Sequence, residues 1–117
     1  RRNSIDRVEG MIQLLRATIA AAKYNMGVGG YFNIIIFDAK EDEPDKRFIE
    51  IFDNRAKLAS EIVHSYYNKF ISYEDNYELI NELIYNRQKT FEEVNDAFLS
   101  SSCNPVKMGK FLRGYKV

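Results

Sequence analysis

The sequence predicts an all-α fold: a small bundle of four to five helices in a single domain spanning residues 1–117. Apolar residues recur every three or four positions over long stretches, which is the spacing of one helix face. The 117 residues are 45% apolar and 14% aromatic, which suits one hydrophobic core and argues against a disordered chain. Because the chain begins with Arg1 rather than Met, it is also compatible with a fragment of a longer protein.

The first predicted helix covers residues 4–26. Asn3 or Ser4 supplies its N-terminal cap, and the glycine-rich segment 27–30 ends it. The pattern runs for about three heptads, which favours a helix packed in a bundle over a free-standing coiled coil. The residues of its apolar seam are Ile5, Val8, Ile12, Leu15, Ile19, Ala22 and Met26.

The short apolar segment 31–38 has uncertain helix or strand character. Its Tyr-Phe-Asn-Ile-Ile-Ile-Phe run is aromatic and β-branched, which favours a strand. No second convincing strand is apparent elsewhere in the chain, and a lone strand leaves its backbone hydrogen-bonding groups unpaired. We therefore expect a short buried helix or an extended segment packed on the bundle, and a strand only if two copies pair through it.

A second long helix is predicted over residues 44–71. Pro44 suits the first turn of a helix, and a stripe from Phe48 to Phe70 gives this helix one apolar face. Arg55 lies near the centre of that stripe. An arginine there must extend to solvent, pair with a buried partner, or mark a gap in the core where a partner binds.

Three further helix starts are predicted. Ser72 is followed three residues later by Asp75, and Thr90 three residues later by Glu93, which is the capping-box spacing. Thr90 is the better match because its partner is a glutamate. The third and fourth helices merge into one if Thr90 stays helical. Residues 104–105, Asn-Pro, predict the start of a last short helix.

The sequence does not assemble a catalytic or metal site. Glu61 and His64 have a spacing found among the ligands of di-metal helical bundles, but a helical wheel places both opposite the apolar face, towards solvent. Cys103 is the one cysteine, so a disulfide framework within the chain is excluded. We expect no catalytic, cofactor-binding or metal-ligating residues, no cofactor, and a protein that is not an enzyme.

Charge is balanced over the chain but unevenly distributed. There are 17 basic and 17 acidic residues. Residues 72–99 carry seven acids and two bases, including an acidic ridge of Glu74, Glu78 and Glu82, whereas residues 104–117 carry four bases and no acid. One interpretation is solvated faces whose opposite signs help the bundle pack. A more specific interpretation is that the basic C-terminal segment binds an acidic partner or nucleic acid.

The sequence is most consistent with a non-enzymatic protein-interaction or regulatory module, cytoplasmic and without a membrane span, that binds another protein or itself as a homodimer. The alternative is weak nucleic-acid binding through the basic N- and C-terminal segments. Tyr67 is a candidate contact residue because it adjoins Tyr66. Two adjacent side chains on a helix cannot both face one core, so one tyrosine should lie at the surface. The candidate partner-binding residues are Arg55, Tyr67, Lys107, Lys110, Arg113 and Lys116.

Overall fold

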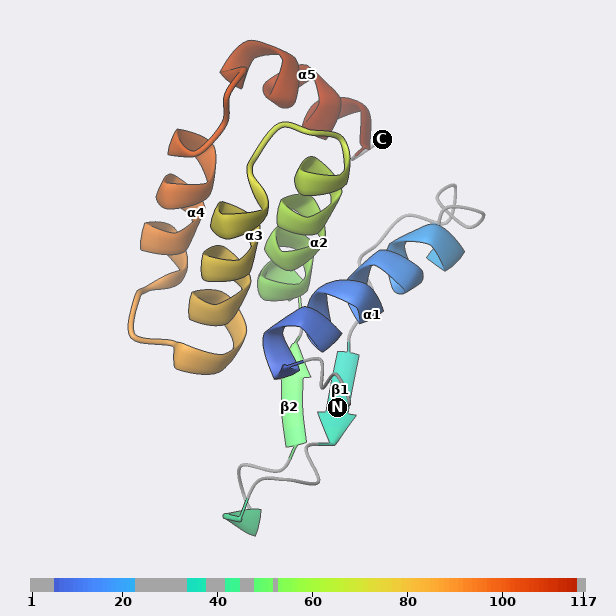
Figure 1. Ribbon diagram of the computed structural model, residues 1–117, viewed down its shortest axis with the longest axis vertical. Helices are drawn as coiled ribbons and strands as arrows, with labels where there is room; N and C mark the ends of the chain where they lie inside the picture. The colour runs from blue at the N-terminus through green and yellow to red at the C-terminus, as the bar shows by residue number, and fades with distance from the viewer. Residues whose placement is uncertain (1–5, 23–33, 38–41, 45–47, 52, 116–117) are drawn as a thin grey trace, which may run out of the picture.

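The structure, a computed structural model, describes residues 6–22, 34–37, 42–44, 48–51 and 53–115. Within these ranges it confirms the all-α class, with a small two-stranded sheet at one end of the bundle (Figure 1). The elements are α1 (Arg7–Ala22), β1 (Ile34–Phe37), β2 (Phe48–Ile51), α2 (Asp53–Tyr67), α3 (Tyr73–Ile80), the π-helix η3 (Asn81–Asn86), α4 (Phe91–Ser100) and α5 (Pro105–Tyr115).

Helix α2 is the centre of the bundle and packs against α1, α3 and α4, while α5 lies across its C-terminal end (Figure 1). The expectation that Glu61 and His64 point to solvent is wrong. Glu61 is only 5% exposed, and the His64 ring packs edge-on against Phe111 of α5, with ring centroids 4.9 Å apart. A helical wheel assumes one buried face, whereas α2 has neighbours on several sides. Its buried residues are Ala56, Leu58, Ala59, Ser60, Glu61, Ile62, Val63 and Ser65.

The uncertain apolar segment contains a strand. Residues 34–37 pair antiparallel with residues 48–51, from Ile34 opposite Ile51 to Phe37 opposite Phe48. The expected short buried helix is therefore wrong for 34–37, and the strand finds its partner within the same chain. Residues 31–33 and 38 lie outside the described residues.

The second helix is shorter than predicted because its first residues belong to β2. Helix α2 spans Asp53–Tyr67, whereas the sequence predicted residues 44–71. Phe48 is 59% exposed and Ile51 is fully buried, as the alternation of a strand requires. Phe48 was therefore assigned to the wrong element, whereas Ala59, Ile62 and Val63 of the same stripe lie in α2 and are buried as predicted.

Helix α1 buries its predicted seam inside the bundle, against α2 and α3. Val8, Met11, Ile12 and Leu15 are each at most 4% exposed. The remainder of the seam lies outside the described residues or carries side chains that are not described. The described part of the seam is therefore core and is closed to a second chain.

The predicted starts of α3 and α4 are confirmed. The Ser72 hydroxyl accepts a hydrogen bond from the backbone N–H of Asp75 at 3.1 Å. Thr90 makes a complete capping box: its hydroxyl accepts from the N–H of Glu93 at 3.1 Å, and the Glu93 carboxylate accepts from the N–H of Thr90 at 2.8 Å. Arg87, with φ 55°, ends η3 in the left-handed region, so the third and fourth helices do not merge.

Helix α5 is tied to the turn that follows α2. Lys69 adopts a left-handed φ of 67°, and the turn closes with a hydrogen bond from the N–H of Phe70 to the carbonyl of Ser65 at 2.9 Å, as in a Schellman motif. The N–H of Cys103 donates to the carbonyl of Phe70 at 3.0 Å. This contact fixes the segment from which α5 starts.

Because α5 closes the core, truncating its inner face should destabilise the protein. Met108 is 2% exposed and Val106 is 69% exposed on the same helix. We expect Met108→Ala to lower the free energy of unfolding by roughly 2–5 kcal/mol, and the matched variant Val106→Ala to change it by less than about 0.5 kcal/mol. Urea denaturation followed by circular dichroism measures both. Equal losses in the two variants would contradict the burial of Met108.

Candidate protein-binding groove

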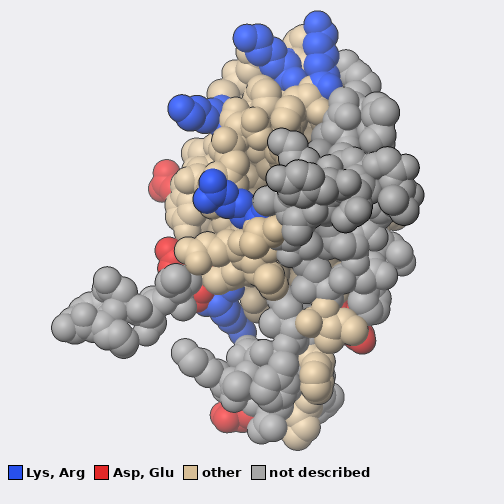
Figure 2. Space-filling view, turned by 90° about the vertical axis from the view of Figure 1, so that its right-hand side faces the viewer, with Lys and Arg blue, Asp and Glu red and all other residues tan. Residues whose placement is uncertain are grey.

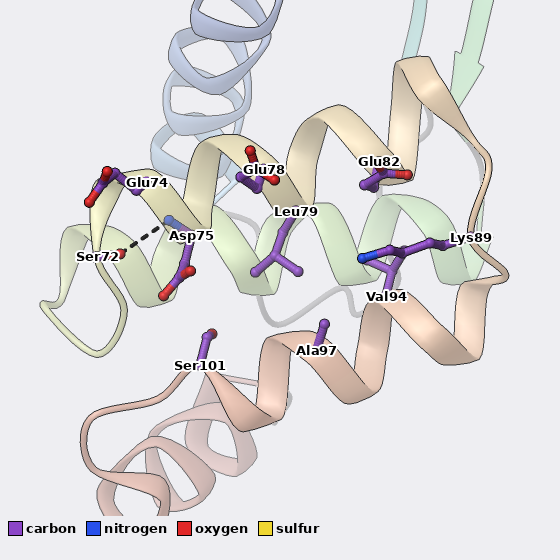
Figure 3. Close-up of a pocket in the computed structure, with 10 residues that line it drawn as sticks. All are labelled: Ser72, Glu74, Asp75, Glu78, Leu79, Glu82, Lys89, Val94, Ala97 and Ser101. Atoms are coloured by element: carbon purple, nitrogen blue, oxygen red, sulfur yellow. Dashed lines mark hydrogen bonds between the residues drawn. The ribbon is translucent and has the colours of Figure 1, made fainter.

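A groove runs between α3–η3 and α4 and encloses about 580 Å³. We call it the α3–α4 groove. One side is an acidic wall formed by four carboxylates, and aliphatic side chains from both helices line the space between the helices (Figure 3). The lining residues are Ser72, Glu74, Asp75, Glu78, Leu79, Glu82, Lys89, Val94, Ala97 and Ser101, of which Glu74, Asp75, Glu78 and Glu82 make the acidic wall.

The two helices aim different side chains into the groove. Leu79 points from α3 towards α4, and Ala97 points back towards α3 (Figure 3). Val94 is 1% exposed and Leu79 is 7% exposed, so they form a shallow aliphatic floor. Lys89 extends from the connection between η3 and α4 along one end of the groove (Figure 3).

The acidic wall follows from helical spacing. Glu74 and Glu78 are four residues apart in α3, and a step of four along an α-helix advances about 6 Å while staying on one face. Glu82 follows four residues later, in η3. Like charges at this spacing repel one another. The Ser72 cap fixes where α3 begins and therefore which edge of the helix the glutamates occupy.

The carboxylates of the wall are largely unpaired. Among the described residues, Glu74, Asp75 and Glu78 make no side-chain hydrogen bond or ion pair. Glu82 accepts one hydrogen bond at Oε2, from the Asn86 side chain at 2.8 Å. Its other oxygen, Oε1, is buried without a hydrogen-bond partner in the described structure. Glu74, Asp75 and Glu78 therefore present acceptor capacity that the described residues do not use.

The opposite edge of α3 is tied to the start of α1 by tyrosine hydroxyls. Tyr77 donates to Oδ2 of Asp6 at 2.7 Å, and Tyr73 donates to Oε2 of Glu9 at 3.3 Å. Burial, followed by the nearby Glu9 carboxylate, raises the pKa of Tyr73 to about 12. Hydrogen bonds from the Glu9 backbone and from Tyr77 lower the pKa of Asp6.

Arg55 makes a structural contact between α2 and η3, and its role in partner binding stays a prediction. Its Nη1 donates to the carbonyl of Leu83 in η3, a carbonyl at the end of a helix that lacks a partner in the helix itself. Arg87 caps the next carbonyl along the chain: its Nε donates a hydrogen bond to the carbonyl oxygen of Ile84 at 3.0 Å. Burial and then the positive charge of Arg87 lower the pKa of Arg55. Arg55 thus holds η3 onto α2.

Tyr67, Lys107 and Lys110 lie towards the opposite end of α2 from Arg55 (Figure 1). Tyr67, at the end of α2, is 38% exposed, and the Arg16 guanidinium lies 4.3 Å from the centre of its ring. Lys107 and Lys110 are exposed on α5, and lysine and arginine side chains gather at this end of the molecule (Figure 2). The side chain of Arg113 and the whole of Lys116 lie outside the described structure. As partner-binding residues, all of these remain predictions.

Sequence reasoning found one side of the groove and missed the other. The acidic ridge is visible as a spacing of four, but it was interpreted as half of a charge pattern. The floor was missed because Leu79, Val94 and Ala97 meet only when α3 and α4 lie side by side. One sequence signal pointed to the groove: a run of acidic residues on one helix is followed, after a short connection, by a second helix that starts at Thr90.

Comparison of the chain with protein-family models, with curated proteins and with solved structures finds no match. Within the described ranges, His, Cys, Asp and Glu do not gather in a group of three that could hold a metal ion. Among the described helices, none has the length and apolar character needed to cross a bilayer. The groove is therefore interpreted from its own geometry.

The hydrogen bond between Tyr77 and Asp6 predicts that the stability of the protein depends on pH. Because the folded-state pKa of Asp6 is lowered, Asp6 stabilises the fold above its unfolded pKa of about 3.9 and loses this effect as pH falls through the folded pKa. Tyr77→Phe should raise the pKa of Asp6 and destabilise the protein at pH 7 more than in acid. Carboxyl NMR titration and urea denaturation measure this. Tyr67→Phe is the control, and an unchanged Asp6 pKa in Tyr77→Phe would contradict the contact.

Removing the hydrogen bond from Arg55 to η3 should lower the stability of the protein. Arg55→Met leaves the Leu83 carbonyl without its donor, which should lower the free energy of unfolding by roughly 1–3 kcal/mol. Lys110→Met, on exposed α5, should be nearly neutral. Thermal and urea unfolding compare the two. An Arg55 variant as stable as the wild type would show that the capping bond contributes nothing.

Proposed function

We propose that this chain is a non-enzymatic protein-interaction module that binds a basic, amphipathic segment of a partner protein in the α3–α4 groove. The observation that carries the proposal is the groove itself, a hollow of about 580 Å³ with carboxylates on one side and aliphatic side chains at its floor.

A helical segment suits this shape. A groove between two packed helices accepts the face of a third helix, which inserts side chains spaced three and four residues apart. The floor, made by Leu79, Val94 and Ala97, has room for small apolar anchors. The acidic wall then selects lysine or arginine beside those anchors, because opposite charges across an interface fix its register.

The exposed ion pairs determine the affinity and the salt dependence that we expect for this binding. Solvent-exposed ion pairs contribute only about 0–1 kcal/mol each, so four wall carboxylates give modest affinity that falls as salt rises. The charges act more on the rate of association than on affinity. We therefore propose a transient partner. The single cysteine, Cys103, fits a reducing compartment, and a cytoplasmic location is part of the proposal.

The alternative remains nucleic-acid binding through the basic segments. It draws support from the exposed Lys107 and Lys110 on α5. Few phosphate contacts give weak, strongly salt-dependent binding. The acidic wall opposes a polyanion, so a nucleic acid would have to bind away from the α3–α4 groove.

A designed probe tests the proposed groove. We expect a synthetic amphipathic peptide of leucine and lysine to bind, and the Glu74→Lys/Glu78→Lys variant to lose at least about tenfold in affinity, equal to ~1.4 kcal/mol. The loss follows because two attractive contacts become repulsive. Isothermal titration calorimetry gives the affinity, and amide NMR shifts should map to residues 72–82 and 94–101.

A matched variant separates the groove from net charge. Glu92→Lys/Asp96→Lys changes the charge equally, and both residues are exposed on α4 outside the groove lining. Glu92 and Glu74 each occupy the second position of a capped helix. This control should bind the peptide nearly as the wild type does. Equal losses in both variants, or stronger binding of a DNA duplex than of the peptide, would contradict the proposed function.

A further inference from the structure

We infer that the occupant of the α3–α4 groove is α5 of a second copy of this chain, so that copies associate head to tail. This inference rests on the proposed function, because it names the partner of the same groove. The features that carry it are the groove, the outward face of α5 and their opposite charges.

The outward face of α5 has the chemistry that the groove requires. Val106 is 69% exposed, and Lys107 and Lys110 are exposed beside it. Residues 106 and 110 are one helical turn apart, and 107 and 110 are three residues apart, so the three side chains share one side of the helix. We call this the basic face of α5. It combines one apolar anchor with two cations.

Helix α5 presents this face in a fixed orientation. Its other side is held in the core by Met108, 2% exposed, and Leu112, 6% exposed. Phe111 adds ring contacts to His64 at 4.9 Å and to Phe70 at 5.2 Å between centroids. Because the inner side is packed on its own bundle, the basic face points away from it and is available to another molecule. A preformed helix loses little conformational entropy on binding.

The charges of groove and helix are complementary within one sequence. Residues 72–99 carry seven acids and two bases, and residues 104–117 carry four bases and no acid. The chain as a whole has a formal net charge of zero, so two copies approach without net repulsion. On the acidic wall, Glu74 and Glu78 form no ion pair within the described structure. Lys107 and Lys110 of a second copy would supply the missing cations.

The symmetry of the contact follows from its two parts. The groove and the basic face of α5 are different surfaces of one chain, so the contact is heterologous rather than a twofold dimer. A pair of copies therefore keeps one free groove, on one chain, and one free α5, on the other. Assembly can therefore continue beyond two copies into rings or chains. A contact made by one helix face is small, which predicts weak, transient association.

Complementary variants of the full chain test this directly. The groove variant Glu74→Lys/Glu78→Lys keeps its α5, and the helix variant Lys107→Glu/Lys110→Glu keeps its groove. By sedimentation velocity, wild-type protein should gain mass with concentration and lose it in high salt. Each variant alone should stay monomeric. An equal mixture should recover association, because the unaltered groove of the helix variant matches the unaltered α5 of the groove variant, and the two reversed surfaces also carry opposite charges.

The matched control is Glu92→Lys/Asp96→Lys, which should assemble as the wild type does, while circular dichroism confirms that every variant is folded. Variants that still self-associate alone, or a mixture that stays monomeric, would overturn the inference. A monomeric wild type that still binds the leucine–lysine peptide would also overturn it, yet would leave the proposed function standing. A wild type that neither assembles nor binds the peptide would overturn both.

Discussion

The structure depends on α2, which has to be covered on several sides at once. Small side chains make this close approach possible, because neighbouring helices pack at distances set by the residues between them. The Ser60 hydroxyl is satisfied within the helix, donating to the carbonyl of Ala56 at 2.8 Å, which offsets the cost of burying it. The buried Ser65 hydroxyl has no hydrogen-bond partner in the described structure. The small buried residues of α2 are Ala56, Ala59, Ser60 and Ser65.

Because the inner sides of the surrounding helices pack on α2, their charged residues lie mainly on the outside of the bundle. Helices α3 and α4 carry acidic residues there, and α5 carries basic ones. The acids of α3 and α4 and the bases of α5 are the visible result. Where two outer helices meet, as α3 and α4 do, their inner sides supply the core and their edges leave the α3–α4 groove. The groove is thus a product of packing around α2, and its charge is a product of which helices lie outermost.

Local patterns predicted the elements that depend on nearby residues. The caps at Ser72 and Thr90 involve contacts three residues apart, and the structure confirms both. The hairpin was missed because strand pairing joins residues 34–37 to 48–51, a relation that no local pattern contains. Phe48 was assigned to the helix because its spacing from the later apolar residues fits one helix face. The alternation over residues 48–51 fits a strand equally well. The groove floor likewise required knowledge of which helices are neighbours.

The π-helix η3 bears on how the chain tolerates changes of length. In it the N–H of Arg87 bonds to the carbonyl of Glu82 at 3.0 Å, five residues back instead of the four of an α-helix. Such a turn is what an α-helix becomes when one residue is inserted and the flanking packing stays in place. Deleting one residue between 81 and 86 would restore ordinary winding. The same deletion inside α2 would rotate every later side chain by about 100°, and no neighbour of α2 could absorb that rotation.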